Sequence, residues 1–500
     1  MLYKSTRNDK LKVTASQAIS QGISEEGGLF VPDSIPSIKD DLSRLAEMDY
    51  YGRAKEILKL YLSDFTEEEI EYCVDNAYAP EKLENSEPAK MVKISDGDKN
   101  IYSLELWHGP TCAFKDMALQ ILPYLLTTSL KKNYDGKTAV ILVATSGDTG
   151  KAALEGFKDV ENTKIMVFYP DNGVSAMQLR QMITQEGNNV CVCAVKGNFD
   201  DCQTQVKKIF TNAEIKKQLA DNNMMFSSAN SINWGRLLPQ VIYYVSAYLD
   251  LYKNGEIESL SDPVNVVVPT GNFGNILAAY YAKRMGINFS RFICASNSNN
   301  VLTDFINSGK YDVNRSFYTT ISPSMDILVS SNLERLLYHL SGENSDLVNE
   351  LMSALSTKGV YDVPETLKAE IQGLFSAGCC DDEQTKATID YYYSELNYLM
   401  DTHTAVAFKV YNDYFATSKD NTPTIIASTA SAYKFSPSVL AALGHDVPAD
   451  DYECVEALSS GTGTEAPLPL MNLRTKEARF DNCCDKDTIK DFVLTKLGIN

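Results

Sequence analysis

The sequence predicts an α/β protein. A mostly helical amino-terminal part comes first, and it is followed by mainly parallel β-sheet that is flanked by helices. One observation favours this fold class, and a second indicates the number of domains. Short apolar runs rich in β-branched residues alternate with helical segments in two separate series along the chain. This alternation is typical of parallel sheets, because each crossover between strands carries a helix onto a face of the sheet. The length of 500 residues also exceeds one ordinary core, so we expect two or three domains.

The amino-terminal part, residues 1–95, is rich in acids, and its pattern is mostly helical. It contains no pairing of a nucleophile with a base, and we expect it to be a supporting domain. A first strand–helix series follows. Its strands are expected at residues 138–144, 165–169 and 190–195, and its helices at 151–157, 176–186 and 200–219.

A long apolar helix is predicted over residues 237–251, ahead of a second series. The strands of this series are expected at 264–268, 292–295 and 424–427, and its helices at 276–284 and 301–306. The stretch from about 325 to 410 is mostly helical and polar, and we interpret it as a helical insertion. The predicted domains are residues 1–95, a small α/β domain at 96–235 and a large α/β domain at 236–500.

Composition and charge narrow the class of function. The 66 acidic and 46 basic residues give a net charge of -20, a field that repels nucleic acids and anionic membrane surfaces. We therefore expect a small-molecule substrate and neither of those partners. No apolar run approaches the ~20 residues of a membrane span. Eleven cysteines without a CxxC pair give little support for a metal site, and with the polar start of the chain they favour free thiols in the cytoplasm.

Lys115 is the most informative residue, and it lies in the stretch HGPTCAFKD at residues 108–116. It follows Phe114 and precedes an apolar run, residues 117–126, that we expect to form a buried helix. A lysine at such a boundary can extend its ammonium into solvent. In an apolar pocket, by contrast, the pKa of a lysine falls, and its amine becomes a nucleophile suited to Schiff-base chemistry. Both alternatives are open on this pattern alone.

A glycine loop, GNFGN at residues 271–275, lies between a predicted strand and a predicted helix. Free N–H groups and the helix dipole favour an anion there, and a tight turn without a ligand is the alternative. The similar segment GNFDD at residues 197–201 carries two aspartates, which repel phosphate but suit a helix start. The contrast favours the first loop as the phosphate site; its members are Gly271, Asn272, Phe273, Gly274 and Asn275.

A second strand-to-helix turn, TSGDT at residues 145–149, places the hydroxyls of Ser146 and Thr149 where they suit a carboxylate or a phosphate. The charge of Asp148 disfavours an anion directly beside it and suits a protonated group instead. A simple capping turn is the alternative.

The stretch NSINWGR at residues 230–236 precedes the long apolar helix. It offers the side chains of Asn230, Ser231 and Arg236, and the guanidinium could hold a phosphate with two N–H groups. An exposed arginine on a surface cap is the alternative. Residues 401–404 are expected to begin a helix, and no direct catalytic role is predicted for His403.

With these residues in hand, the chain resembles the threonine synthase family, pyridoxal phosphate enzymes of fold type II. The resemblance runs nearly from end to end. It is carried by the segments already quoted and by STR at 5–7, EGGLFVP at 26–32, SPSMD at 322–326, SNLER at 331–335 and DTHTA at 401–405. It implies two mainly parallel sheets, pyridoxal 5'-phosphate as the cofactor and no metal.

The resemblance also implies a role for each matching residue. Lys115, next to Phe114, would carry the cofactor as a Schiff base and move protons. Residues 271–275 would hold the cofactor phosphate, Asp148 would lie near the phenolic oxygen of the ring, and Thr429 would offer its hydroxyl to the pyridine nitrogen. Ser146 and Thr149 would receive the substrate carboxylate, and Asn230, Ser231 and Arg236 its phosphate. One departure is Ser431, where many family members have histidine.

The reaction implied in this way converts O-phospho-L-homoserine and water into L-threonine and phosphate, the last step of threonine biosynthesis. One alternative is a pyridoxal phosphate-dependent lyase or dehydratase of another phosphorylated or hydroxy amino acid. Another is a catalytically silent relative that binds a metabolite. By resemblance we expect a monomer, with a dimer as the alternative.

Overall fold

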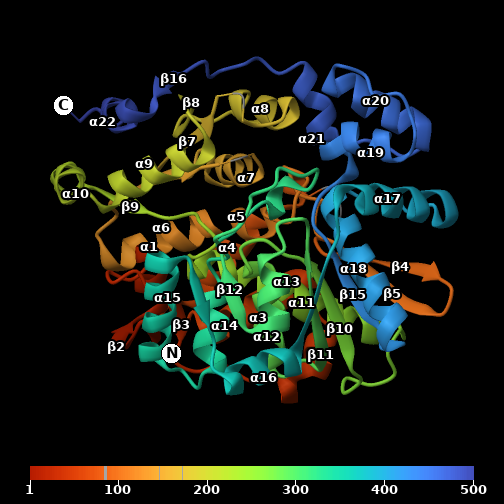
Figure 1. The fold of residues 1–500 in the computed structure, drawn as a ribbon. Helices are drawn as coiled ribbons and strands as arrows, with labels where there is room; N and C mark the ends of the chain where they lie inside the picture. Colours follow the sequence, from red (N-terminus) through yellow and green to blue (C-terminus); the bar gives the residue numbers. More distant parts are fainter. Residues whose placement is uncertain (84–86, 146, 172, 500) are drawn as a thin grey trace.

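Two parallel sheets organise the chain in the computed structural model, which describes residues 1–83, 87–145, 147–171 and 173–499 (Figure 1). The larger sheet has six strands in the order β14-β11-β10-β15-β5-β4, which are Phe375–Cys379, Phe289–Ser296, Val264–Pro269, Thr424–Ser428, Lys99–Glu105 and Lys90–Asp96. Its neighbouring strands run parallel except for the antiparallel pair β4 and β5. The predicted α/β class with mainly parallel sheets is confirmed.

The smaller sheet has five parallel strands in the order β16-β8-β7-β6-β9, which are Cys483–Asp485, Val190–Lys196, Thr163–Pro170, Thr138–Ala144 and Met224–Ser227. Alternate residues of β6 enter different cores. Val140 and Leu142 join the cluster that contains Ile209 and Val493, whereas Ile141 and Val143 join the main core. Burial on both faces explains the continuous apolar run by which this strand was predicted.

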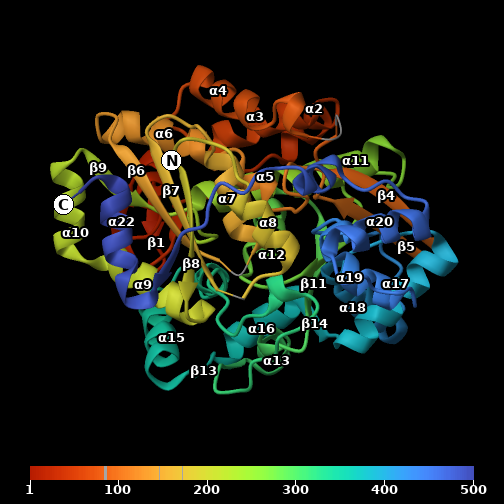
Figure 2. The same cartoon turned by 90° about the horizontal axis from the view of Figure 1, so that it is seen from above.

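Helices cover both sheets. Those associated with the smaller sheet are α5 (Asp116–Leu119), α6 (Leu122–Asn133), α7 (Asp148–Phe157), α8 (Ala176–Ile183), α9 (Phe199–Thr211), α10 (Ala213–Asp221) and α22 (Ile489–Leu497). Figure 2 shows α22 beside α9 at the end of the molecule where α10 also lies. The carboxyl-terminal strand and helix therefore complete a sheet that begins near residue 138.

The larger sheet lies between two sets of helices. Val266 and Ile425 face the core shared with α11 (Trp234–Lys253) and α12 (Gly274–Met285), whereas Val267 and Ile426 face α18 (Thr402–Ser418). The remaining elements of this part are α13 (Val301–Ser308), β12 (Lys310–Asp312), α14 (Leu333–Leu340), α15 (Ser345–Lys358), β13 (Val360–Asp362), α16 (Glu365–Leu374), α17 (Asp382–Leu396), α19 (Ser436–Ala442), α20 (Asp451–Thr462) and α21 (Leu468–Met471).

The amino-terminal part is mostly helical, as predicted, with α1 (Ala15–Gln21), α2 (Leu42–Ala46), α3 (Tyr50–Tyr61) and α4 (Glu67–Ala77). It also contains a small antiparallel sheet that the sequence pattern did not predict, made of β1 (Tyr3–Ser5), β2 (Asn8–Val13) and β3 (Phe30–Pro32). Strands of three to six residues are too short to show a clear alternation.

Two predicted helices are each divided. The apolar run 117–126 forms α5 and the start of α6, because Pro123 begins a new helix where its missing N–H costs nothing. The predicted helix 200–219 breaks at Asn212, whose side chain accepts a hydrogen bond from the Ile215 N–H and so caps α10.

The stretch near 325–410 is mostly helical, but it is also part of the sheet architecture. Its strand β14 pairs with β11, and α18 covers one face of the larger sheet. The sheets also draw strands from beyond the predicted domain limits. Strands β4 and β5 join the larger sheet, and β16 joins the smaller one.

Three strand ends define the place where chemistry can occur. Strands β6, β10 and β15 end at Ala144, Pro269 and Ser428, directly before the TSGDT turn, the GNFGN loop and Thr429. In parallel sheets, ligands bind in the crevice outside these carboxyl ends. Among the described helices, none is long and apolar enough to cross a bilayer.

Candidate active site

The amine of Lys115 lies among side chains from distant parts of the chain. Its Nζ donates to the Ser324 Oγ at 3.2 Å and lies 3.5 Å from Asp148 Oδ2. The Phe114 ring centroid is 5.3 Å away. The Lys115 side chain is only 10% exposed, so the alternative in which it extends into solvent is wrong.

Asp148 is the centre of a buried polar cluster. Its Oδ1 accepts from Gln178 Nε2 at 3.1 Å and forms an ion pair with Lys434 Nζ at 2.8 Å. Its Oδ2 accepts from the Ser324 hydroxyl at 3.2 Å. A buried carboxylate with this many donors is well satisfied.

Charge and burial compete in setting the pKa values of this cluster. Burial lowers the pKa of Lys115; Asp148 opposes this, and Lys434 and Arg236 lower it further. Burial alone would raise the pKa of Asp148, but Lys434 and Lys115 outweigh it and hold that pKa well below its usual range. The site therefore contains a carboxylate beside an amine that loses its proton more easily than an exposed lysine.

The GNFGN loop lies next to Ser324, which contacts both Lys115 and Asp148. A Cβ at Gly271 would lie 2.8 Å from the carbonyl oxygen of Ser324, so glycine allows this close approach. Phe273 adopts a left-handed conformation with φ of 64° at the start of α12, which leaves the first N–H groups of the helix without intrahelical partners. The Asn275 Oδ1 accepts from Tyr243 and Tyr244, while its buried Nδ2 finds no partner among the described residues.

The TSGDT turn is shaped by Thr145. Its Oγ1 accepts from the N–H groups of Gly147 and Gly150, both at 3.0 Å, so this hydroxyl closes the turn at the start of α7. Thr149 is half-buried in the first turn of the helix. Ser146, the other predicted substrate ligand here, lies outside the described residues.

Thr429 lies beside the lysine segment. The Phe114 N–H donates to the Thr429 carbonyl at 2.8 Å, and the Ser431 N–H donates to the Cys112 carbonyl at 3.1 Å. Ser431, the departure from the family pattern, uses its side chain to accept from the Tyr433 N–H at 3.4 Å in the 3-10 turn Ala432–Phe435. This turn presents Lys434 to Asp148.

Arg236 is buried, so the predicted alternative of an exposed arginine on a surface cap is wrong. Its Nη1 donates to the Ala229 carbonyl at 2.8 Å, and it forms no ion pair with any acid in the described part of the chain. Burial lowers its pKa to about 10. Asn230 is exposed and Ser231 half-buried at the start of the same turn, and the side chain of neither forms a hydrogen bond with another described residue.

Ser324 and the residues behind it were not among the predicted site residues. The Ser324 N–H donates to His403 Nε2 at 3.1 Å, and His403 Nδ1 contacts Asp401 Oδ1 at 2.8 Å. His403 therefore accepts at Nε2 and carries its proton on Nδ1, which Asp401 binds. As predicted, residues 401–404 begin a helix, with Asp401 as the N-cap of α18. The SPSMD segment was the available signal for Ser324.

The segment GNFDD at residues 197–201, which resembles the GNFGN loop, starts helix α9. Asn198 is the N-cap of α9 and accepts from the Asp201 N–H, while the Asp201 carboxylate accepts from the Asn198 N–H. This reciprocal capping confirms that the segment 197–201 is a helix start.

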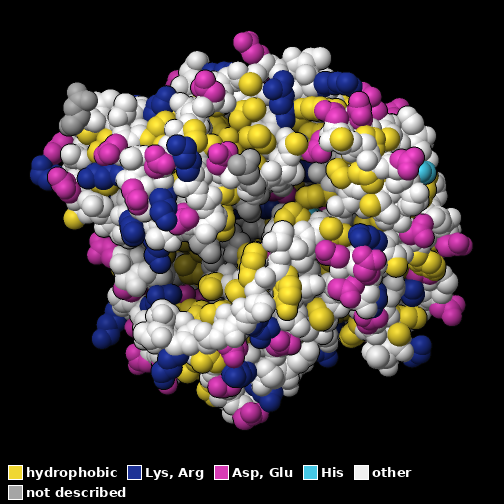
Figure 3. All heavy atoms as spheres, turned by 45° about the horizontal axis from the view of Figure 1, so that its top comes forward, with side chains coloured by type: hydrophobic (Ala, Val, Ile, Leu, Met, Phe, Trp, Pro, Cys, Tyr) yellow, Lys and Arg dark blue, Asp and Glu magenta, His cyan; other side chains and the backbone are white. Residues whose placement is uncertain are grey.

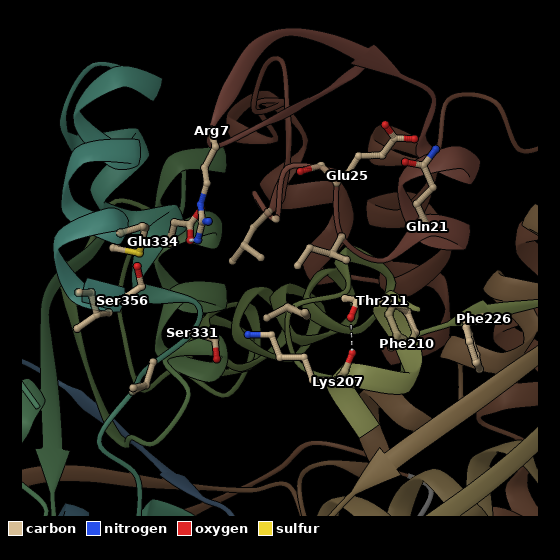
Figure 4. Close-up of a pocket in the computed structure, with 18 of the residues that line it drawn as sticks. Arg7, Gln21, Glu25, Lys207, Phe210, Thr211, Phe226, Ser331, Glu334 and Ser356 are labelled. Carbon is tan, nitrogen blue, oxygen red and sulfur yellow. Dashed lines mark hydrogen bonds and ion pairs between the residues drawn. The ribbon is translucent and has the colours of Figure 1, made fainter. Parts of the chain in front are cut away.

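A pocket of about 1070 Å³ lies against the outer side of these loops (Figure 4). Ile232, Ser330 and Ser331 form part of its wall, and the Ser330 hydroxyl donates to the Gly271 carbonyl at 2.7 Å. Figure 4 shows Lys207 extending into the pocket from α9. Figure 3 shows a face of the molecule that is hollowed near its middle, with Lys and Arg side chains around the hollow.

Comparisons with known proteins agree with this geometry. Three family models match: "Threonine synthase N terminus" over residues 2–78, "Pyridoxal-phosphate dependent enzyme" over residues 88–357 and "Threonine synthase, C-terminal" over residues 404–493. Threonine synthase of Eremothecium gossypii is 34% identical, over 100% of this chain and 99% of its own length. A crystal structure of pyridoxal phosphate-bound threonine synthase from Brucella melitensis superposes with a TM-score of 0.87 at 34% identity, covering 99% of this chain and 98% of that one.

Human threonine synthase-like 1 is 41% identical over 86% of this chain. The chain spans only 58% of the length of that relative.

The fold and the site define a pyridoxal phosphate-dependent enzyme. A glycine loop follows a strand of the mainly parallel larger sheet, a buried lysine contacts Ser324 beside it, and the family match covers the lysine and the loop. Within that class, the chain belongs to the threonine synthase family.

The residues present fit the cofactor, pyridoxal 5'-phosphate. The buried amine of Lys115, with its lowered pKa, suits an aldehyde. The start of α12, with no room for a Cβ at Gly271 and an unpartnered Asn275 Nδ2 among the described residues, suits a phosphate. Within the described ranges, no group of three or more His, Cys, Asp or Glu residues could hold a metal ion.

Proposed function

We propose that this enzyme converts O-phospho-L-homoserine and water into L-threonine and phosphate. The observation that carries the proposal is the buried Arg236, which has no acidic partner in the described chain and lies close enough to Lys115 to lower its pKa. A buried unpaired cation is costly until an anion reaches it. A phosphorylated substrate held next to the lysine would supply that anion.

The roles that we assign are those implied by the resemblance to the family, and the burial of Lys115 and its contact with Ser324 support them. Lys115 holds the cofactor and moves protons at the substrate, while Gly271, Asn272, Phe273, Gly274 and Asn275 hold the cofactor phosphate. Asp148 would lie near the phenolic oxygen of the ring, and Thr429 would offer its hydroxyl to the pyridine nitrogen. When bound, the cofactor supplies an electron sink for the carbanion that forms at the substrate.

The substrate itself is assigned to two groups of residues. Ser146 and Thr149, at the start of α7, receive its carboxylate. Asn230, Ser231 and Arg236, at the start of α11, bind its phosphate and stabilise the charge on that group as it leaves. The short sequence distance between Arg236 and the half-buried Ser231 supports a shared site at this helix start.

We further propose that the substrate enters through the pocket of Figure 4. The pocket wall contacts the GNFGN loop through Ser330, and it includes Ile232, which lies between Ser231 and the first turn of α11. A volume of about 1070 Å³ leaves ample room for a phosphorylated amino acid to pass.

The test is a paired assay on the purified protein with pyridoxal 5'-phosphate and O-phospho-L-homoserine, in which phosphate and L-threonine are counted together. Equal release of both is the expected result. Phosphate released with a ketoacid in place of threonine would favour the lyase alternative. Neither product from this substrate, with turnover of another phosphorylated amino acid, would reassign the substrate, and no turnover of any would favour the silent relative.

We also propose that the enzyme acts as a monomer in the cytoplasm. All the residues assigned a role belong to one chain, which supports a site that needs no second subunit. No disulfide joins cysteines of the described residues, which supports a reducing compartment. Light scattering at working concentration tests the monomer, and a stable dimer would contradict it.

A further inference from the structure

Two lysines face one buried carboxylate in this site. Lys434 Nζ lies 2.8 Å from Asp148 Oδ1, and Lys115 Nζ lies 3.5 Å from Asp148 Oδ2. The Lys434 side chain is fully buried, with 0% exposure. Cofactor chemistry needs only one of these amines, so the second one requires an explanation.

Lys434 is fixed more firmly than Lys115. Its Nζ also donates to the Thr111 carbonyl at 2.9 Å, and its own N–H donates to the Ser431 carbonyl at 3.1 Å. Thr111 is fixed in turn, because its N–H and hydroxyl donate to the two oxygens of Asp116 at 2.8 and 2.6 Å. Lys115, by contrast, makes one hydrogen bond within the described chain, to a serine hydroxyl.

A carboxylate beside a reactive lysine creates a difficulty. An opposite charge nearby favours the protonated ammonium, and a protonated amine cannot attack an aldehyde. If Lys115 were the only cation facing Asp148, the two would form a buried ion pair that holds the lysine in its unreactive form. A second cation, paired with the other carboxylate oxygen, weakens this ion pair.

We propose that Lys434 is the counter-ion of Asp148, and that its charge releases Lys115 from Asp148 to react as a neutral amine with the cofactor aldehyde. Lys434 is in this sense a positioning residue, since it acts through Asp148. The inference concerns the uptake of the cofactor and does not depend on which substrate the enzyme uses.

The step that this arrangement assists is a condensation. The lone pair of the neutral Lys115 nitrogen attacks the aldehyde carbon, and a carbon–nitrogen bond forms. The carbonyl oxygen leaves as water with the two hydrogens of the amine, and nothing is oxidised or reduced.

Four charged or titratable groups influence the charge state of Lys115 or of Asp148. Asp148 on α7, Arg236 on α11 and Lys434 on the 3-10 turn act on Lys115, and His403 on α18 acts on Asp148. Of these, only Asp148 raises the pKa of Lys115, while Arg236 and Lys434 lower it. Removing Lys434 should therefore raise the pKa of Lys115, and removing Asp148 should lower it.

The test measures how fast the full-length apoprotein takes up pyridoxal 5'-phosphate between pH 6 and 10, followed by visible absorbance. The rate should rise with pH through an inflection set by Lys115. In Lys434→Met, we expect this inflection to move up by about one pH unit, which slows uptake about tenfold on its acidic side. In Asp148→Asn it should move down. The double variant removes both charges and should return close to the wild-type inflection, as should Lys434→Arg.

Lys151→Met is the matched control. Lys151 is also a buried lysine and shares α7 with Asp148, but it pairs with Glu155 at 2.8 Å. Its loss should leave the inflection unchanged. If Lys434→Met does not fold, the two other variants still give different expectations, namely a lowered inflection in Asp148→Asn and a nearly unchanged one in the double variant. An inflection that stays in place in all variants, with uptake slowed equally at every pH, would mean that Lys434 is only structural and would overturn the proposal.

Discussion

At the scale of single residues, the site is built from charged groups that have been removed from water. Arg236 is the simplest case, since its described contacts are to a backbone carbonyl and its pKa falls to about 10 through burial. Lys115, Asp148 and Lys434 form the more complex case, in which two cations share one carboxylate. Such groups persist in folded proteins mainly when a ligand or a reaction uses them.

Replacing Arg236 with leucine should raise the KM for the phosphorylated substrate far more than it weakens cofactor binding. Truncating one partner of a desolvated charge pair costs about 2–5 kcal/mol, which corresponds to a loss in kcat/KM of roughly 30-fold to several thousand-fold. Steady-state kinetics and a cofactor titration on the same preparation measure both effects. Arg474→Leu is the control, because Arg474 is 53% exposed and its partner Glu456 is as exposed. An equal loss of cofactor affinity would place Arg236 at the other phosphate.

At the scale of elements, the site depends on how helices start after strands. Helix α12 starts at Gly274 behind the left-handed Phe273, and α7 starts behind Gly147, whose φ is 143°. A Cβ at Gly271, just ahead of Phe273, would lie 2.8 Å from the Ser324 carbonyl oxygen, and a Cβ at Gly147 would lie 2.3 Å from the Gln178 side chain. These two turns therefore fix the positions of the anion-binding N–H groups.

Gly271→Ala tests this close approach. The new Cβ would lie 2.8 Å from the Ser324 carbonyl oxygen, so either the loop or the 322–326 segment must move. We expect cofactor affinity to fall at least tenfold, measured by equilibrium titration. Gly373→Ala is the matched control, because Gly373 lies within α16, where a Cβ would meet nothing within 4 Å. That control should keep its cofactor affinity and gain about 0.5–1 kcal/mol of stability.

The contact between α12 and α14 predicts how stability depends on pH. The hydroxyl of Tyr281 lies 2.8 Å from His339 Nε2, and burial lowers the pKa of His339 to about 3. In the unfolded chain this pKa is about 6.5. The unfolded state therefore binds the extra proton first, and stability is lost as pH falls from about 6.5 toward 3, by about 1.4 kcal/mol per pH unit from this residue.

His339→Gln should remove this contribution, because glutamine does not titrate and its amide oxygen can still accept from Tyr281. Urea unfolding between pH 4.5 and 6.5 gives the apparent free energy of unfolding of both proteins. We expect the variant to lose less of it per pH unit, by about 1.4 kcal/mol. If the free energies of unfolding of the two proteins changed equally with pH, the pKa of His339 would be the same in the folded and unfolded states, and the prediction would be wrong.

At the scale of the whole molecule, a strongly acidic protein surrounds a pocket with unpaired cations. The net charge is -20, yet Lys137, Lys207 and Lys216 line the pocket without an acidic partner among the described residues. Arg7, on the same wall, is paired with Glu334 at 2.7 Å. Four cations and two acids, Glu25 and Glu334, line the pocket, and a cleft with an excess of positive charge raises the local concentration of anionic ligands.

Lys207→Gln should lower kcat/KM for the phosphorylated substrate severalfold at low ionic strength and leave kcat unchanged. The difference from wild type should shrink as salt is added, because the Debye length is about 10 Å at 0.1 M. Lys208→Gln is the matched control, since Lys208 is the next residue of α9 and does not line the pocket. If the two variants behave alike at every salt concentration, the substrate does not pass this wall.

Much of the architecture could be predicted because the strands are buried on both faces. The prediction for β6 matches both of its ends, and β10 differs from its prediction by one residue. Strands β5, β9, β14 and β16 escaped prediction, since they are short or mixed in polarity, as in KNIYSLE of β5. Their strand character comes from their neighbours in the sheet and not from their own pattern.

The residues of the candidate site also differ in how well the sequence alone could predict them. Lys115 and the glycine loops have local signals, because each lies next to a recognisable apolar element. Ser324 lies in the SPSMD segment, but that segment does not indicate its partners, since Ser324 meets Lys115 across 209 residues of chain and Asp148 across 176. Lys434 lies three residues after Ser431, and nothing in the sequence around it indicates which buried carboxylate it would face. Contacts of this kind are decided by topology, which local pattern does not specify.

The place of β15 in the larger sheet affects how the molecule is made. This strand, Thr424–Ser428, is inserted between β10 and β5, and it leads directly into Thr429. While the chain is being synthesised, the β4–β5 hairpin must wait for more than 300 residues before its neighbour emerges from the ribosome. At about 5–20 residues per second, that delay is on the order of tens of seconds. A nascent chain therefore cannot complete the larger sheet, or the cofactor site at its strand ends, before β15 has been synthesised.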